Sequence, residues 1–258
     1  MTQSEFKFLG IHHIIVLMLT GVIPLALSAL VRRVNSHKLT RTVRYTLGVI
    51  LLGNDIVHLG YRFIRGEFNL FLRYFLPLHV CGLATFATAA TLLFQIQTLY
   101  EFAYFWGLVG TFNAVLTPQL EVGFPNYRAF QYFIAHSGIV IGVLFSTLGL
   151  QMRPSLRSLF RSFAVINLLA LVIGGFNYLA SANYMFLCEP PKTKFPVFNP
   201  ESPLFIPWPL YIPILDVLAL ILFFVVYSPF LIRDWRKRTA GNADFGNSTT
   251  DCSNHLSE

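Results

Sequence analysis

Charged side chains are scarce in this sequence. Asp, Glu, Lys and Arg make up only 12% of its 258 residues, whereas hydrophobic residues make up 55%. A soluble domain usually has about 25% charged residues, so the composition excludes an ordinary water-soluble protein and favours an integral membrane protein. The formal net charge is +7. The basic residues lie in short groups between apolar segments, which is typical of membrane topology signals rather than of nucleic-acid binding.

Cysteines and local catalytic motifs are also few. The three cysteines, Cys81, Cys188 and Cys252, have no CxxC spacing and do not predict a disulfide-rich domain. A disulfide between Cys81 and Cys188 is still compatible with the sequence. There is no HxxxH or HExxH pair, so we expect no metal. There is also no glycine-rich phosphate loop and no Ser-His-Asp motif, and we expect no cofactor.

Long apolar stretches are abundant instead. A transmembrane helix needs about 20 apolar residues, and seven segments approach or exceed this length. They are 11–31, 43–64, 74–95, 98–118, 130–150, 159–182 and 209–232. We therefore predict an all-α, polytopic bundle of seven transmembrane helices within residues 1–238, with the first apolar segment retained as a helix. Residues 239–258 are polar, and we predict that they form a disordered cytoplasmic tail.

The basic residues are distributed unequally between the two sides of this bundle. Twelve lie on the side of the C-terminus and seven lie on the other side. Because an excess of Lys and Arg marks the cytoplasmic side, we predict an outer N-terminus and an inner C-terminus in a plasma or inner membrane. The twelve are Arg32, Arg33, Lys38, Arg41, Arg44, Arg153, Arg157, Arg161, Arg233, Arg236, Lys237 and Arg238, and the seven are Lys7, Arg62, Arg65, Arg73, Arg128, Lys192 and Lys194.

Polar and ionisable side chains occur inside several of the predicted spans. A charged group costs roughly 2.5–3.5 kcal/mol at the centre of a spanning helix, so such groups are expected to face a cavity. Given a helix rise of about 1.5 Å per residue, nearly all of them fall within roughly 10 Å of the outer boundary. We therefore predict a polar pocket in the outer half of the bundle. Its candidate residues are Asp55, His58, His79, Cys81, Asn113, His136, Asn177 and Asp216.

Some of these residues also have a structural interpretation. Asp55 and Arg62 lie on one helical face and can form an ion pair. Asp216 can pair with a histidine and fix its tautomer. Cys81 can be a small buried hydrophobic residue rather than a nucleophile.

The spacing of His79 and Cys81 argues against a catalytic pair within one helix. Two residues are separated by about 200° around a helix, so the two side chains cannot both point into one cavity. A histidine from another helix, His136 or His58, is then the better candidate for a base that activates Cys81.

Several segments resemble a known bacterial family. They are Leu76–Cys81 (LPLHVC), Tyr104–Leu108 leading to Leu116–Pro118, the His136 helix ending at Arg153-Pro154, Asn183–Pro190 (NYMFLCEP) and Pro207–Ile212 (PWPLYI). Together they resemble the YwaF-like bacterial integral membrane family over most of the chain, from about residue 76 to 230. That family is in turn distantly similar to a human transmembrane acyltransferase that moves polyunsaturated acyl chains onto lyso-ether phospholipids.

This resemblance implies chemistry through a thioester on a cysteine beside a histidine at the start of the third span. The human pattern is Pro-Cys-His, and the matching positions here are Pro77, Leu78 and His79. The histidine is therefore retained, whereas the cysteine position holds leucine and Cys81 lies further along the chain. His136 resembles the second histidine of the family.

We therefore predict a membrane-embedded lipid acyltransferase or acyl-lipid hydrolase that acts on a phospholipid or acyl lipid. Cys81 would be the nucleophile and His136 the general base, and His79 would stabilise an oxyanion or bind the head group. The predicted substrate-binding residues are Asp55, His58, Asn113, Asn177 and Asp216. The alternative is a non-enzymatic transporter, or a protein that binds a lipid or small solute in the same cavity. Nucleic acid is not an expected partner, and the sequence does not define the oligomeric state.

Overall fold

The computed structural model describes residues 5–64, 68–191 and 198–254. Within these ranges the chain is mainly helical, and one isolated antiparallel bridge joins Glu5 to Val122. Arg65, Lys192 and Lys194, which contribute to the charge count above, lie outside the described residues. The described elements are α1 (Ile11–Val34), α2 (His37–Ile64), α3 (Phe68–Leu70), the π-helix η1 (Phe71–Phe75), α4 (Val80–Phe94), α5 (Gln97–Phe102), the π-helix η2 (Ala103–Thr111), α6 (Phe112–Leu116), α7 (Tyr127–Leu148), α8 (Leu156–Ala180), the 3-10 helix η3 (Tyr184–Phe186) and α9 (Tyr211–Asn254).

Five of the described helices are long and apolar enough to cross a membrane. They are α1, α2, α7, α8 and the Tyr211–Arg236 part of α9. Helix α4 is apolar but shorter, and α5, η2 and α6 follow one another directly along the chain. The structure thus supports a helical membrane protein, whereas the seven spans and the orientation remain predictions. Helix α9 continues to Asn254, and the division into a bundle and a tail also remains a prediction.

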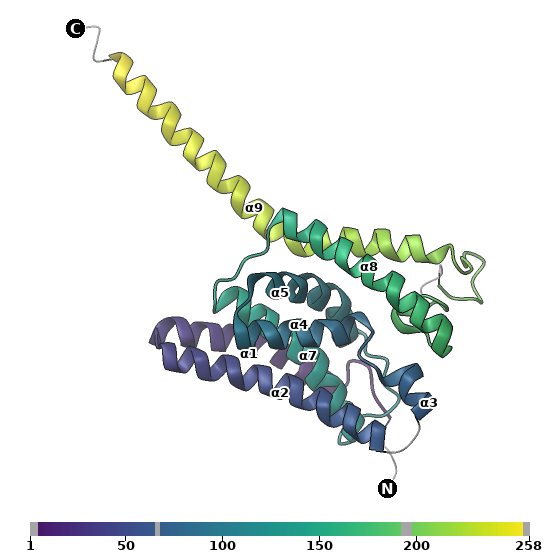
Figure 1. Ribbon diagram of the computed structural model, residues 1–258. Helices are drawn as coiled ribbons and strands as arrows, with labels where there is room; N and C mark the ends of the chain where they lie inside the picture. Colours follow the sequence, from purple (N-terminus) through teal and green to yellow (C-terminus); the bar gives the residue numbers. More distant parts are fainter. Residues whose placement is uncertain (1–4, 65–67, 192–197, 255–258) are drawn as a thin grey trace.

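The connections between the long helices gather at two ends of the molecule (Figure 1). One end holds the α1–α2, α4–α5 and α7–α8 connections. The N-terminus, α3 and the α8–α9 connection lie at the opposite end, and α9 projects beyond the bundle. Helices α2, α4 and α7 contact one another in pairs, so side chains on their facing surfaces come together.

Residues in the left-handed conformation follow three of the described helices, α1, α4 and α8. Asn35 (φ 47°) follows α1, and its N–H donates to the carbonyl oxygen of Val31. Gln95 (φ 55°) follows α4 and donates in the same way to Thr91. Such residues satisfy carbonyl groups that the helix end leaves unpaired, and they allow the chain to reverse into the next helix.

Arg44 of α2 forms hydrogen bonds with carbonyl groups at the end of α4. Its Nε and one terminal nitrogen donate to the carbonyl oxygens of Leu92 and Leu93, each at 2.9 Å. A cation at this position also interacts favourably with the negative end of the helix dipole. This buried arginine therefore has a packing role in addition to its place in the charge pattern.

The third predicted span, 74–95, is not one continuous helix. The π-helix η1 ends at Phe75, Leu76 has an extended backbone (φ −66°, ψ 145°), and α4 begins at Val80. Pro77 accounts for the break because proline in a helix interior lacks an N–H donor and clashes with the preceding turn.

His79 therefore precedes α4 as its N-terminal cap residue and has an extended backbone (φ −71°, ψ 155°). The angular argument that separates His79 from Cys81 on one helix does not apply, since only Cys81 lies within α4. The extended segment passes close over the first turn of α4. A Cβ atom on Gly82 would lie 2.7 Å from the Pro77 carbonyl oxygen, so the fold requires glycine at that position.

The π-helix η2 lies in the centre of the hydrophobic core. Its Phe105 is fully buried and stacks on Phe223 of α9 with 5.0 Å between ring centroids. At Gly107 a Cβ atom would come within 2.8 Å of Ile139 in α7, so glycine permits the close approach of these two helices. Wide helical turns of this kind occur frequently near functional sites.

Candidate functional site

Helices α2, α4 and α7 contact one another and carry a chain of interacting polar side chains that includes Cys81, which we call the Cys81 cluster. Its members are Asp55 of α2, Cys81 and Thr85 of α4, and Tyr132 and His136 of α7. The Asp55 carboxylate interacts with the Thr85 side chain, and its charge acts on the Cys81 thiol. The Tyr132 hydroxyl also interacts electrostatically with the thiol, and its ring lies 4.1 Å from the His136 ring.

The thiol of Cys81 is free, and so is that of Cys188. The disulfide that the sequence left open therefore does not form in the structure. Cys81 is partly buried within the bundle, whereas Cys188 is exposed beyond the end of α8.

The hydrogen bonding of His136 defines its tautomer. Its Nδ1 lies 2.8 Å from the carbonyl oxygen of Tyr132, one helical turn earlier in α7. A carbonyl oxygen can only accept, so Nδ1 must carry the proton. The lone pair is then on Nε2, which gives His136 the form of imidazole that can act as a base.

The opposite tautomer occurs at His79. The backbone N–H of Met185 donates to His79 Nδ1 at 3.3 Å, so the ring proton is on Nε2. The ring also packs edge-to-face on Tyr184, with 5.1 Å between centroids, and contacts Phe186. His79 can therefore donate a hydrogen bond from Nε2 to a developing negative charge.

Asn177 holds the loop that contacts His79. Its side chain donates to the Tyr184 carbonyl oxygen at 2.9 Å and accepts from the Tyr184 N–H at 3.0 Å. The buried Tyr184 hydroxyl donates to the Leu72 carbonyl oxygen and accepts from the Leu76 N–H. Asn177 thus positions Tyr184 and, through it, the segment that contains His79.

Two other predicted site residues make contacts that do not include the Cys81 cluster. Asp216 of α9 accepts a hydrogen bond from Asn167 of α8 at 3.1 Å instead of meeting a histidine. Asn113 of α6 is exposed and hydrogen-bonds with Thr117 of the next turn.

His58 and Arg62 of α2 both contact the ring of Phe75. The His58 ring lies edge-on to it at 6.2 Å, and the Arg62 guanidinium lies over it at 4.2 Å. The ion pair of Arg62 with Asp55 that the sequence left open does not form in the described structure, where the two ion pairs join Arg153 to Asp234 and Arg161 to Glu101.

The sequence pattern did not identify two residues whose side chains bind the backbone of other segments. Tyr184 lies in the quoted NYMFLC segment, but nothing in that pattern indicates that its hydroxyl binds the chain before α4. His13 was also overlooked, although it lies in the first apolar segment. It is fully buried, its Nε2 donates to the Val115 carbonyl oxygen at 2.9 Å, and its Nδ1 accepts from the Leu9 N–H, so its role is structural.

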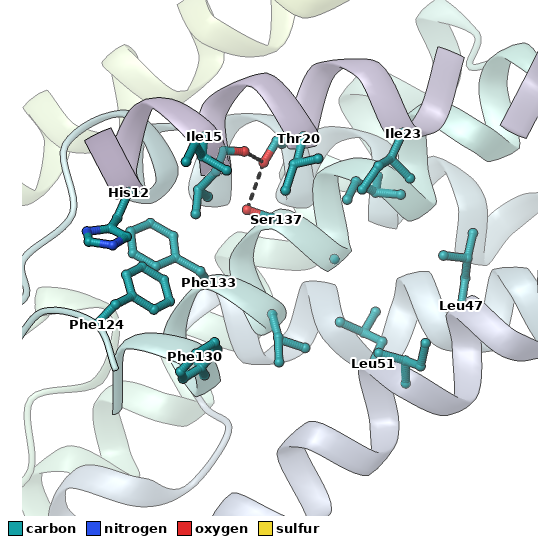
Figure 2. Close-up of a pocket in the computed structure, with 16 residues that line it drawn as sticks. His12, Ile15, Thr20, Ile23, Leu47, Leu51, Phe124, Phe130, Phe133 and Ser137 are labelled. Carbon is teal, nitrogen blue, oxygen red and sulfur yellow. Dashed lines mark hydrogen bonds between the residues drawn. The ribbon is translucent and has the colours of Figure 1, made fainter. Parts of the chain in front are cut away.

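An apolar groove of about 460 Å³ runs between α1, α2 and α7 (Figure 2). Side chains such as Ile15, Ile23 and Leu51 form its walls, and His12 and Phe124 lie at one end. Its polar hydroxyls, from Thr20 and Ser137, hydrogen-bond to each other at 2.8 Å. The described residues contain no group of three or more His, Cys, Asp or Glu side chains that could hold a metal ion.

Comparisons with known proteins agree with a helical membrane protein. An uncharacterised protein of Treponema pallidum (strain Nichols) is 30% identical over 157 residues, which is 60% of this chain and 62% of that protein. The chain thus matches less than two thirds of the length of this relative. No solved structure matches the chain. The model of the TMEM164 family matches residues 8–227, from before α1 to within α9. The chain therefore belongs to the TMEM164 family.

Proposed function

We propose that this protein is a membrane-embedded enzyme that transfers or hydrolyses lipid acyl groups through a thioester on Cys81. The observation that carries the proposal is the Cys81 cluster, in which Asp55 and Tyr132 act electrostatically on a free thiol and the Tyr132 ring packs on His136. The resemblance to the YwaF-like family and to the human acyltransferase supports the same chemistry. Its nucleophile position corresponds to Leu78 here, so Cys81 takes over that function in this proposal.

The proposed reaction uses the two histidine tautomers in different roles. His136 Nε2 accepts the proton of the Cys81 thiol, and the thiolate attacks the carbonyl carbon of an acyl ester. His79 Nε2–H donates a hydrogen bond to the resulting oxyanion. The ester C–O bond then breaks, and the His136 imidazolium returns its proton to the departing alcohol oxygen, which leaves an acyl thioester on Cys81.

The thioester is resolved by the same steps in reverse. His136 removes a proton from an acceptor hydroxyl, which attacks the thioester carbonyl carbon, and the thiol of Cys81 is released with that proton. A lysophospholipid hydroxyl as acceptor gives acyl transfer, and water as acceptor gives hydrolysis. We place this reaction in the outer half of a plasma or inner membrane.

The thioester provides a direct test. Purified protein is incubated with a phospholipid that carries an isotope-labelled acyl chain, and the Cys81 peptide is analysed by mass spectrometry before and after hydroxylamine treatment. We expect hydroxylamine-sensitive acylation of Cys81 in the wild type and in Cys188→Ala, and none at this site in Cys81→Ala. Full acyl transfer by Cys81→Ala would eliminate Cys81 as the nucleophile.

The apolar groove favours a second candidate, a protein that binds or moves a lipid without covalent chemistry. Pockets of several hundred Å³ with mostly apolar walls are typical ligand sites, and this one lies between helices that can span a membrane. Lipid retained by the purified protein without any Cys81 thioester would favour this candidate. An Ile141→Trp substitution would fill the groove and should then reduce the retained lipid.

A further inference from the structure

Three basic or ionisable side chains gather where the last turns of α2 meet the start of α7. They are His58, Arg62 and Arg128. Tyr61 and Tyr127, the neighbours of the two arginines, have ring centroids 6.1 Å apart, which places these parts of α2 and α7 side by side. The charge of Arg128 acts on both His58 and Arg62. We call these three residues the outer basic cluster.

The outer basic cluster has unused hydrogen-bonding capacity. Nδ1 of His58 and Nε of Arg62 are buried, and neither has a hydrogen-bond partner among the described residues. The face of the Phe75 ring offsets part of the Arg62 charge, but an aromatic face is a much weaker acceptor than an oxygen atom. Buried polar nitrogens without partners are uncommon and costly in native proteins.

Within the part of the chain that the structure describes, the cluster has no carboxylate counter-ion, since both ion pairs involve other arginines, Arg153 and Arg161. The carboxylate on the same helix, Asp55, interacts with the Asn54 and Thr85 side chains instead. Two arginines that repel each other without an anion between them are electrostatically unfavourable, and a bound anion would relieve this repulsion.

We propose that the outer basic cluster binds the phosphate group of the substrate. Arginine is the side chain best suited to this ligand because its planar guanidinium donates several hydrogen bonds to phosphate oxygens. Phosphate is a constant part of every phospholipid head group, and the same chemistry would admit free inorganic phosphate. The assignment of the cluster to the enzyme's own substrate rests on the function proposed above.

The position of the cluster along α2 suits a phospholipid. Asp55, a member of the Cys81 cluster, precedes Arg62 by seven residues, which corresponds to roughly 10 Å along a helix axis. Both residues lie on one helical face, with His58 between them. Only a few bonds separate the phosphate of a phospholipid from its acyl ester. A phospholipid whose phosphate lies at Arg62 can therefore extend its acyl ester along α2 toward Cys81.

The test compares lipids that differ only in phosphate. Lysophosphatidylglycerol and monoacylglycerol with the same acyl chain are titrated onto the purified full-length protein in detergent, and bound lipid is counted by native mass spectrometry. We expect Arg62→Gln and Arg128→Gln to weaken lysophosphatidylglycerol binding by about 10-fold or more. Monoacylglycerol binding should not change. Arg62→Lys, which keeps the charge, should retain more binding than Arg62→Gln.

Three controls separate the explanations. Arg33→Gln removes one exposed charge at the opposite end of α1–α2 and should bind both lipids normally. Inorganic phosphate is added as a competitor of lysophosphatidylglycerol. If it displaces the lipid at matched concentrations, the cluster binds free phosphate, and if it does not, the cluster binds the lipid head group. Cys81→Ala should bind lysophosphatidylglycerol normally, so that loss of the thioester and loss of phosphate binding are observed independently.

The proposal would be overturned if both glutamine variants bound lysophosphatidylglycerol as tightly as the wild type. It would also fail if monoacylglycerol binding fell to the same extent, because the arginines would then maintain the fold rather than recognise phosphate.

Discussion

His79 and His136, the two histidines of the proposed reaction, differ in which ring nitrogen carries the proton. In each case a hydrogen bond to a backbone group determines the tautomer. His136 donates from Nδ1 to the carbonyl oxygen of Tyr132, whereas His79 accepts at Nδ1 from the N–H of Met185. One ring therefore presents a lone pair at Nε2 and the other presents an N–H. These are the groups that a general base and an oxyanion donor require.

This difference in tautomer predicts that substitution by glutamine has different effects at His79 and at His136. Glutamine can place an amide N–H near the position of histidine Nε2, but it cannot act as a base. We therefore expect His79→Gln to retain more acyl-transfer activity than His79→Ala, which should lose about 10²–10³-fold in kcat. His136→Gln should be as inactive as His136→Ala, with a loss of about 10²–10⁴-fold. Turnover of a labelled phospholipid measures all four variants.

The roles would have to be exchanged if His136→Gln were active and His79→Gln were not. Each variant is first checked for a single symmetric peak in size-exclusion chromatography, so that a folding defect is not counted as a catalytic one. His13→Gln serves as a comparison, since both nitrogens of His13 are bound to backbone groups and we expect its loss to affect stability rather than chemistry.

At the scale of elements, the segment before α4 determines where His79 lies. Pro77 interrupts the helix, and the chain then passes within contact of the first turn of α4 at Gly82. A Cβ atom at this position would meet the carbonyl oxygen, carbonyl carbon and Cα of Pro77 at 2.7–2.8 Å. Backbone atoms cannot rotate away as a flexible side chain can, so the whole segment would have to move.

Gly82→Ala is therefore expected to destabilise the protein by about 1–3 kcal/mol, the usual cost of forcing an extra methyl group into a packed site. Gly53→Ala in α2 is the matched control, because its Cβ would meet nothing within 4 Å. Alanine is favoured over glycine in a helix by about 1 kcal/mol, so this variant should be neutral or slightly stabilised. Thermal unfolding in detergent measures both, and equal melting temperatures would contradict the packing argument.

The sequence predicted the helices better than the contacts between them. Hydrophobic length located the long helices α1, α2, α7, α8 and α9 because burial in lipid demands a continuous apolar segment. The break before α4 was missed even though Pro77 is a recognised helix breaker, since the apolar run continues through it. The π-helices η1 and η2 have no signal in the hydrophobic pattern.

In the candidate site, too, contacts within one helix could be predicted but contacts between helices could not. Tyr132 and His136 are four residues apart in α7, a spacing that puts two side chains on one helical face, and their rings are in contact. The proximity of Tyr132 to Cys81, and of Met185 to His79, depends on how separate helices pack. A single sequence does not encode that packing in its local pattern, so those neighbours could not be predicted.

For the molecule as a whole, the polar groups that carry the proposals lie toward one end of the helices. The outer basic cluster lies at the end of α2, and the loop that positions His79 follows the end of α8. Connections between α1 and α2 and between α4 and α5 lie at the other end (Figure 1). If the charge bias sets the orientation, the end with the His79 loop faces outward.

Cys188 offers a native reporter for this orientation, because its thiol is free and exposed after α8. In right-side-out vesicles we expect a membrane-impermeant maleimide to label Cys188 without permeabilisation, and Cys188→Ser to lose that label. Cys252, in the predicted inner tail, should react only after the vesicles are opened, and Cys252→Ser identifies its signal. Labelling of Cys252 in sealed vesicles, with Cys188 protected, would reverse the predicted orientation and would place the Cys81 cluster in the inner half of the membrane.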